Sequence, residues 1–208
     1  MWLVFVGSDG SGKSTVAERL ESRCAQQGKK LELFHWRPEI LPSPERLLGR
    51  KISPHDATQP HAYPPRSRFI SLLLRVYYLV DFWLGYFYRV KPALKRPNSV
   101  VLFERFYYDV IFDPKRYRLH QDVAVSRLLC SLAPRPDYII ALLGPPNVIH
   151  DRKKELTVTE IERQQKLIRV HFGSRPNVLW FDPAAVNADE IAARICESIS
   201  SKDERTPP

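Results

Sequence analysis

The sequence predicts an α/β protein in which a five-stranded parallel sheet is covered by helices on both faces. Five short apolar runs alternate along the chain with stretches of helical apolar spacing, which is the order typical of parallel strands joined by helical crossovers. A glycine-rich segment separates the first apolar run from the first helical stretch. With 208 residues and 44% hydrophobic composition, the chain suffices for one core and is short for two, so we expect one domain over residues 1–199.

The first elements are a strand, a glycine loop, a helix and a second strand. Residues 2–6 are apolar at every position, as in a strand buried on both faces. No basic segment precedes this run and no cleavage site follows it, so it does not resemble a signal peptide. Residues 15–27 carry apolar side chains at helical spacing and end before Gly28, and residues 30–35 form the next predicted strand.

The middle of the chain contains an insert followed by a long helix. Residues 37–68 are rich in proline, histidine and basic side chains, so we expect little regular structure in a substrate-side insert at about residues 36–68. Residues 69–90 form a long apolar helix that contains Arg75, Asp81 and Arg89. Each such charge costs about 2.5 to 3.5 kcal/mol at a bilayer centre. We therefore expect a largely buried core helix and no transmembrane span, with a peripheral membrane or partner surface as the alternative.

The remaining elements complete the alternation. Thr159 and Glu162 match the capping box that begins a helix. The polar residues 200–208 are expected to form a disordered tail. The other predicted elements are strands at residues 99–103, 137–143 and 178–181 and helices at residues 126–133 and 188–199.

Composition restricts the setting and the partners. The net charge of +9 favours anionic partners, among which charge alone does not choose. The three cysteines form no CxxC pair, which argues against a zinc site and a disulfide framework and is consistent with a reducing cytoplasm. The six histidines show no metal-ligand spacing.

The glycine loop carries the strongest motif. Gly7, Gly12, Lys13 and Ser14 match the Walker A pattern G-x-x-x-x-G-K-[ST], and the pattern lies between a predicted strand and a predicted helix. Glycines allow backbone N–H groups to surround phosphate oxygens, and the helix N-terminus adds a positive dipole end. Lys13 would contact the terminal phosphates of ATP and Ser14 would bind Mg²⁺. The predicted nucleotide-binding residues are Gly7, Ser8, Gly10, Ser11, Gly12, Lys13, Ser14 and Thr15.

Two further groups of residues fit phosphoryl transfer. Glu104 follows the strand at residues 99–103, where a carboxylate would hold the Mg²⁺ water shell, and Arg105 could bridge donor and acceptor phosphates. Tyr107, Tyr108 and Asp109 follow closely enough to line the same cleft, with purely structural roles as the alternative. A basic cluster then marks a predicted lid at about residues 147–165, formed by Arg152, Lys153 and Lys154 with Arg163 beyond. Which lid residue reaches the phosphates stays open.

These residues resemble the thymidylate kinase family of nucleoside monophosphate kinases, in order and spacing over nearly the whole chain. The likeness rests on Ser8-Asp9-Gly10-Ser11-Gly12-Lys13-Ser14-Thr15, on Glu104-Arg105-Phe106, on a basic lid over residues 152–165, and on Phe181-Asp182-Pro183. It implies a P-loop NTPase fold with three α/β/α layers. It also implies that Asp9 faces the acceptor, that Arg105 binds the acceptor phosphate and that Asp182 lies in the loop bordering adenine.

The sequence departs from this family on the acceptor side. The family's Arg-Glu-Pro-Gly turn is replaced by His35-Trp36-Arg37-Pro38-Glu39, so only Arg37 carries over. The family's Ala-Asp-Arg signature, which reads thymine, is not found within residues 69–90. The chain therefore resembles a divergent branch whose acceptor need not be dTMP.

We expect a cytoplasmic kinase that needs ATP and Mg²⁺ and phosphorylates a small anionic acceptor, foremost a nucleoside monophosphate. One alternative is a kinase for a sugar or another alcohol, in which Asp9 or Glu104 would have to act as the base. Another is a nucleotide-dependent regulator or nucleic-acid-binding NTPase, although the chain has no recognisable nucleic-acid module. A homodimer is left open. The expected catalytic residues are Asp9, Lys13, Glu104, Arg105 and Arg152, and the expected acceptor-binding residues are Asp9, Arg37, Arg105 and Tyr108.

Overall fold

Five parallel strands form a single sheet in the order β2-β3-β1-β4-β5. The structure is a computed structural model and describes residues 1–47, 61 and 63–203. It confirms the predicted α/β fold with a five-stranded parallel sheet. The strands are β1 (Trp2–Val6), β2 (Lys30–Phe34), β3 (Ser99–Phe103), β4 (Tyr138–Leu142) and β5 (Val178–Phe181).

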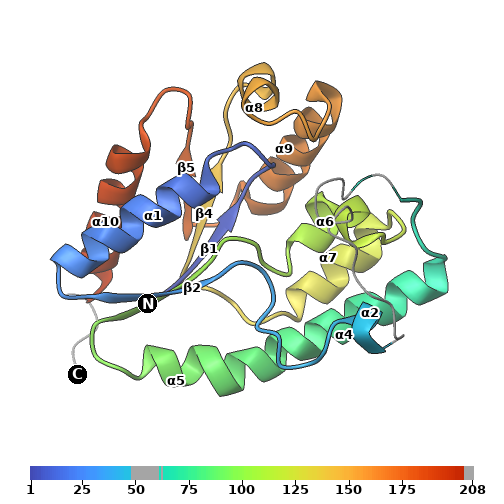
Figure 1. The fold of residues 1–208 in the computed structure, drawn as a ribbon, viewed down its shortest axis with the longest axis horizontal. Coiled ribbons are helices and arrows are strands. Elements are labelled where there is room, and N and C mark those ends of the chain that lie inside the picture. Colours follow the sequence, from blue (N-terminus) through green and yellow to red (C-terminus); the bar gives the residue numbers. More distant parts are fainter. Residues whose placement is uncertain (48–60, 62, 204–208) are drawn as a thin grey trace.

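Helices of very different length connect the strands (Figure 1). The longest continuous helical segment, α4 with its extensions, passes through a π-helical turn, η1, into α5. A 3₁₀ turn, η2, follows α6. The helical elements are α1 (Lys13–Gln26), α2 (Pro44–Leu47), α4 (Arg68–Gly85), η1 (Tyr86–Val90), α5 (Lys91–Leu94), α6 (Asp109–Phe112), η2 (Pro114–Tyr117), α7 (Val123–Ser131), α8 (Pro146–Arg152), α9 (Val158–Phe172) and α10 (Ala188–Asp203).

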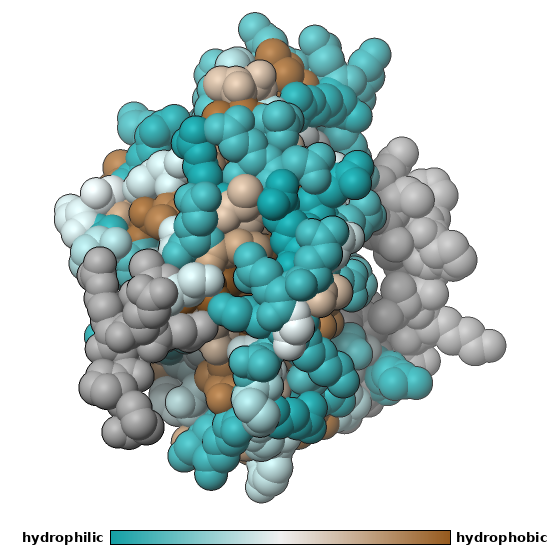
Figure 2. Space-filling view, turned by 90° about the vertical axis from the view of Figure 1, so that its left-hand side faces the viewer, coloured by the Kyte–Doolittle hydropathy of each residue, from teal (hydrophilic) through white to brown (hydrophobic). Residues whose placement is uncertain are grey.

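The sheet separates two apolar cores, because successive side chains of a strand point to opposite faces. In β1, Leu3 and Phe5 pack with α1 and α10, whereas Trp2, Val4 and Val6 pack with α4, α6 and α9. Helices therefore cover both faces of the sheet (Figure 1). The outer surface on the side of α1 and α10 is mainly hydrophilic, with only scattered apolar areas (Figure 2).

All strands are parallel, so their carboxyl ends lie at one edge of the sheet. β1 is central, and Val4 is paired with Phe103 of β3 and with Ile139 of β4. This register brings three connections together: the glycine loop after Val6, the segment that begins at Glu104, and the loop after β5. Open parallel sheets bind ligands at this edge.

Several predicted element ends are wrong. Helix α9 begins at Val158, with Thr157 as its cap, because the Thr157 hydroxyl accepts a hydrogen bond from the Glu160 N–H at 3.2 Å. The capping box predicted at Thr159 is therefore displaced by two residues. Helix α7 starts at Val123, three residues earlier than predicted, since Asp122 caps it.

Other differences concern the insert and the tail. Residues 200–203 belong to α10, so the tail predicted to be disordered is helical there, and residues 204–208 lie outside the described residues. The predicted insert contains the short helix α2, and its residues 48–60 and 62 also lie outside the described part. The short elements α6, η2 and α8 were not predicted, since four to seven residues are too few to show helical periodicity.

The long helix is only half buried, which corrects the expectation of a core helix. Its inner face includes Arg75 and Asp81, which are 2% and 0% exposed. Arg75 donates to the Ser126 hydroxyl at 3.0 Å, and the Asp81 carboxylate lies 3.1 Å from the Arg37 guanidinium. Two of the three charges that argued against a membrane span, Arg75 and Asp81, thus tie the helix to the domain, whereas Arg89 is exposed.

Candidate functional site

A cavity of about 930 Å³ lies at the carboxyl edge of the sheet, within the size range of small-molecule sites. The glycine loop and the start of α1 form one wall, and the loop between β5 and α10 faces them. Glu104 and Arg105, which follow β3, line it as well. Five basic side chains reach the cavity: Lys13, Arg105, Arg116, Arg152 and Lys153.

The glycine loop delivers the uncapped N-terminus of α1 to this cavity. Gly12 is the N-cap in the left-handed region, with φ of 85°, which glycine adopts without strain. No side chain caps α1 and its first turn holds no acidic residue. The first N–H groups and the positive dipole end of α1 are therefore not occupied by a capping side chain, as an anion site requires. Ser14 and Thr15 are exposed in the same wall.

Gly10 brings the loop against the segment that includes α8. A Cβ atom at this position would lie 2.7 Å from the carbonyl oxygen of Ile149 and 3.1 Å from the Lys153 side chain. Its φ of 85° is also left-handed. Only glycine combines this conformation with this approach, so the loop and the start of the predicted lid are packed directly together.

Lys13 is buried beneath the loop. Its Nζ donates to the Gly7 and Ser8 carbonyl oxygens, both at 2.7 Å, and to the Ser11 hydroxyl at 3.4 Å. These three residues do not line the cavity, but they hold the lysine that does. Burial, followed by the charge of Arg105, lowers the pKa of Lys13 to about 7. A ligand with negative charge would reverse this shift.

An ion-pair cluster surrounds Asp9. Its carboxylate pairs with both Arg105 and Arg116, and Arg105 also binds Asp109 at 3.0 Å. Burial is the largest single influence on Arg105 and acts to lower its pKa, but Asp109, Tyr117 and Asp113 together outweigh burial and the pKa is raised. Burial raises the pKa of Asp109, and Arg105 opposes this. Arg116 also lies 3.2 Å from Asp113 and 3.7 Å from Glu155, so the cluster contains two guanidinium groups and four carboxylates.

Glu104 and Ser14 line the same cavity and supply the oxygen ligands that Mg²⁺ prefers. The Glu104 carboxylate is 12% exposed and its Oε2 lies 2.7 Å from Nδ1 of His35. Because the ring of His35 is 82% exposed, it could turn away when a cation binds. The donor set thus fits a magnesium–nucleotide complex.

The lid residues divide into two groups. Arg152 lines the cavity and donates to the Pro183 carbonyl oxygen at 3.1 Å, and Lys153 lines it too, with its Nζ 3.0 Å from Glu155. Arg163 is turned elsewhere, toward Glu160 at 2.6 Å and the Phe112 carbonyl oxygen at 2.9 Å. Of the predicted lid cations, Arg152 and Lys153 therefore line the cavity, and Lys154 and Arg163 do not.

Three other predicted site residues lie away from the cavity. Arg37 is 6% exposed and paired with Asp81. Tyr108 is 2% exposed, packs against Phe106 and has a pKa raised by burial to about 12. Asp182 accepts a hydrogen bond from the Ala184 N–H at 2.8 Å, so it shapes the loop whose following residues line the cavity.

Arg116 is the main site residue that the sequence analysis missed. It lies in η2, a turn of four residues without periodicity, more than a hundred residues from Asp9. The one local signal was Asp113-Pro114, a typical start of a helical turn, and Asp113 does cap η2. Tyr117, in the same turn, gives η2 a second contact with the ion-pair cluster, because its hydroxyl lies 3.2 Å from the Asp109 carboxylate.

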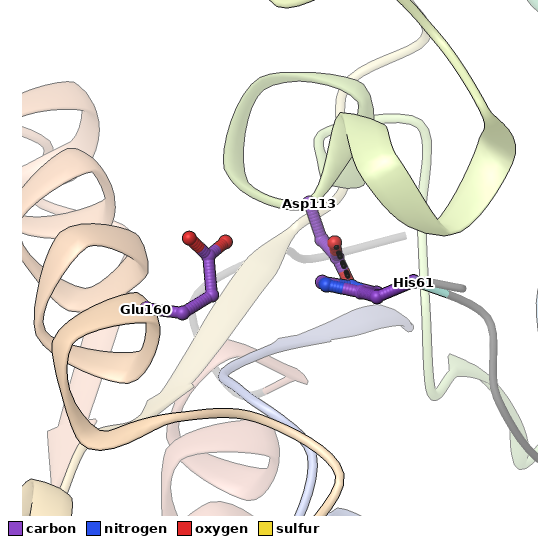
Figure 3. A group of neighbouring side chains, drawn as sticks. All are labelled: His61, Asp113 and Glu160. Carbon is purple, nitrogen blue, oxygen red and sulfur yellow. Dashed lines mark ion pairs between the residues drawn. The ribbon is translucent and has the colours of Figure 1, made fainter. Parts of the chain in front are cut away.

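A second polar group lies beside the cluster. His61, Asp113 and Glu160 come from separate parts of the chain, and their ligand atoms lie within 4.8 Å of one another (Figure 3). An ion pair of 2.7 Å joins His61 to Asp113. Both carboxylates are already paired with arginines, Asp113 with Arg116 and Glu160 with Arg163. The charges of this group are therefore balanced by side chains, and we describe it as an ion-pair network.

No protein-family model matches this chain, and no curated protein matches its sequence.

Proposed function

We propose that this protein is a P-loop kinase, similar to nucleoside monophosphate kinases, that transfers the γ-phosphoryl group of ATP to a small anionic acceptor with the help of Mg²⁺. One observation carries the proposal: the uncapped start of α1, the buried Lys13 and four further cations converge on one cavity at the carboxyl edge of the sheet. Phosphoryl transfer depends mainly on positioning and on stabilising dispersed negative charge. This arrangement meets both needs.

The glycine loop and Lys13 form the donor side. Backbone N–H groups at the start of α1 would bind phosphate oxygens, and Lys13 would leave the Gly7 and Ser8 carbonyls to contact the terminal phosphates. Ser14 and Glu104 would hold the magnesium of the nucleotide complex. Magnesium would offset the negative charge on the phosphates. The Pro183–Asn187 loop would border the remainder of the nucleotide.

The Asp9 cluster forms the acceptor side. Arg105 and Arg116 present two guanidinium groups next to the loop, a geometry suited to bidentate binding of a phosphate. An acceptor phosphate would take over these contacts from the Asp9 carboxylate. A phosphate acceptor is largely dianionic at neutral pH and needs no base.

An alcohol acceptor fits the geometry less well. Its hydroxyl would need a base, and both oxygens of Asp9 are engaged by arginines while Glu104 contacts His35. A substrate hydroxyl would first have to displace one of these partners. We therefore favour a nucleoside monophosphate over a sugar as the acceptor class.

The lid would supply mobile cations. Arg152 and Lys153 lie at the end of α8 and line the cavity together with Arg105 and Arg116. An arginine that reaches the moving phosphoryl group can raise the rate about 10³- to 10⁵-fold. A nucleic-acid role has less support, because the chain has no recognisable nucleic-acid module.

A coupled assay of ADP release tests the proposal. The protein is offered Mg²⁺–ATP with a panel of nucleoside monophosphates, sugars and sugar phosphates, and Lys13→Ala provides the background. Lys153→Ala and Lys154→Ala form a matched pair, since the two exposed lysines are neighbours and only Lys153 lines the cavity. We expect acceptor-dependent turnover that Lys153→Ala lowers and Lys154→Ala retains. Turnover no higher than the Lys13→Ala background with every acceptor would remove the basis of the proposal.

A further inference from the structure

The outer surface of the long helix carries a stripe of exposed apolar side chains. They recur at alternating intervals of four and three residues, which places them along one side of the helix. Their exposed fractions run from 37% to 69%. We call this set the apolar stripe: Phe69, Leu73, Val76, Val80, Trp83 and Phe87.

Helix α7 broadens the stripe. Leu128 and Leu132 are 65% and 54% exposed, and the indole N–H of Trp83 donates to the Leu132 carbonyl oxygen at 2.9 Å. Helices α4 and α7 lie side by side on the face of the domain away from α1 and α10 (Figure 1). The surface near α1 and α10, by contrast, is mainly hydrophilic (Figure 2).

The exposed charges along the stripe are mainly basic. Arg68, Arg89 and Lys91 are all exposed, and Lys91 Nζ lies 5.8 Å from the centre of the Phe87 ring. Asp81 is the only acidic residue in residues 63–98, and it is fully buried. Residues 123–136, which include α7, contain no acidic residue. Asp122, the half-buried cap of α7, is an acidic residue near Phe69, and the other charges near the stripe are mainly basic. An apolar face with mainly basic neighbours complements an anionic surface.

The helix is not suited to cross a membrane, because the side chains of its inner face are bound inside the domain. Residues 68–94 are long and apolar enough to cross a bilayer by length and composition. Arg75 and Asp81 are, however, bound inside the domain, and Tyr78 and Phe82 belong to its core. Extraction of the helix would expose these charges and this core to lipid, so the helix can lie on a membrane but does not cross one.

A second copy of the chain also fits the stripe poorly. Helices that pair through four-three spacing use opposite charges beside the apolar seam. Here both ends of the stripe are basic, Arg68 at one end and Arg89 and Lys91 at the other. Parallel and antiparallel pairing would both bring like charges together.

We propose that the apolar stripe and the adjoining face of α7 dock reversibly on anionic phospholipid bilayers. Phe69, Trp83 and Phe87 enter the interfacial region, and the basic side chains contact the headgroups. Membrane binding is non-covalent and depends on both the apolar and the basic side chains. Each Lys or Arg near an anionic surface strengthens binding about fivefold. This inference does not depend on the proposed kinase activity.

Vesicle co-sedimentation of the full chain tests the proposal. Vesicles of phosphatidylcholine alone are compared with vesicles that also contain phosphatidylglycerol. We expect binding only to the anionic vesicles and weaker binding as salt increases. Leu73→Gln/Phe87→Gln should lower the partition coefficient on the order of tenfold or more, and Arg89→Gln/Lys91→Gln should also lower it. Val170→Gln, which changes a side chain 62% exposed on α9, is the control and should bind like the unmodified chain.

Two results would overturn the proposal. One is binding that is absent, or that is equal for the two kinds of vesicle. The other is a dimer in sedimentation velocity, without vesicles, that Leu73→Gln/Phe87→Gln converts to a monomer. Circular dichroism checks that each variant is folded. We expect all of them to fold, because the substituted side chains are exposed.

Discussion

The depressed pKa of Lys13 makes nucleotide affinity strongly dependent on pH. In the ligand-free protein, burial and Arg105 lower this pKa to about 7 from 10.5. A bound triphosphate would bring several negative charges to Nζ and return the pKa to its ordinary value or above. At pH 8 only about a tenth of the free protein carries a charged Lys13, so nucleotide binding should take up about 0.9 proton.

Isothermal titration calorimetry measures this uptake directly. Mg²⁺–ATP is titrated at pH 8 in buffers that differ in ionisation enthalpy, and the slope of the observed enthalpy gives the number of protons. The association constant should also fall about tenfold for each pH unit above 8, until pH reaches the pKa of the bound state. Lys13→Met, which cannot titrate, should bind weakly and show neither effect. Binding by the unmodified chain that is independent of pH between 8 and 10, without proton uptake, would refute the reasoning.

The lowered pKa of Lys13 also predicts how the stability of the ligand-free protein changes with pH. The folded-state pKa lies below the unfolded value, so burial of the charged lysine destabilises the fold in full below pH 7. This destabilisation is relieved as pH rises from 7 to 10.5. The shift corresponds to on the order of 5 kcal/mol. Lys13→Met should therefore raise the free energy of unfolding at pH 6 by a few kcal/mol, and the gain should shrink toward pH 10.5 in urea titrations.

Three further predictions concern the loop, the acceptor side and the lid helix. Gly10→Ala should weaken Mg²⁺–ATP binding more than tenfold in calorimetry, because its Cβ would meet the Ile149 carbonyl at 2.7 Å; unchanged affinity would contradict the close packing. Arg116→Ala should raise the KM of the acceptor about tenfold or more and leave the KM of ATP nearly unchanged in the coupled assay; equal effects on both would argue against an acceptor role. Thr157→Ala should lower the free energy of unfolding by about 1 kcal/mol, whereas Thr159→Ala should change it by less than about 0.5 kcal/mol. A larger loss for Thr159→Ala than for Thr157→Ala would indicate that Thr159 is the cap, as the sequence predicted.

The sequence was most informative where a pattern is local. Residues 2–6 are apolar at every position because β1 is central and covered on both faces, and the structure places the strand at Trp2–Val6. The glycine loop was equally clear, since Gly12 must adopt a positive φ just before α1. At the start of α9, two threonines two residues apart could each cap the helix, and the structure uses Thr157 because the helix begins at Val158.

Side chains that depend on tertiary pairing could not be assigned in this way. Arg37 was expected at the acceptor, but Asp81 lies in the facing helix and binds it in the core. Arg116 showed no motif of its own and enters the site only because the turn after Asp113 directs it to Asp9. The exposure of the apolar stripe was also hidden, because apolar residues surround much of the helix and composition does not indicate which face meets the domain.

Transfer of label from γ-labelled ATP tests the central claim most directly, because it distinguishes a kinase from a nucleotide hydrolase. The protein is incubated with Mg²⁺, labelled ATP and nucleoside monophosphates in turn, and the products are separated by chromatography. We predict that the label appears in a nucleoside diphosphate formed from at least one of these acceptors, and that Lys13→Ala abolishes its formation. Label found only in inorganic phosphate, or in no product at all, would contradict the account.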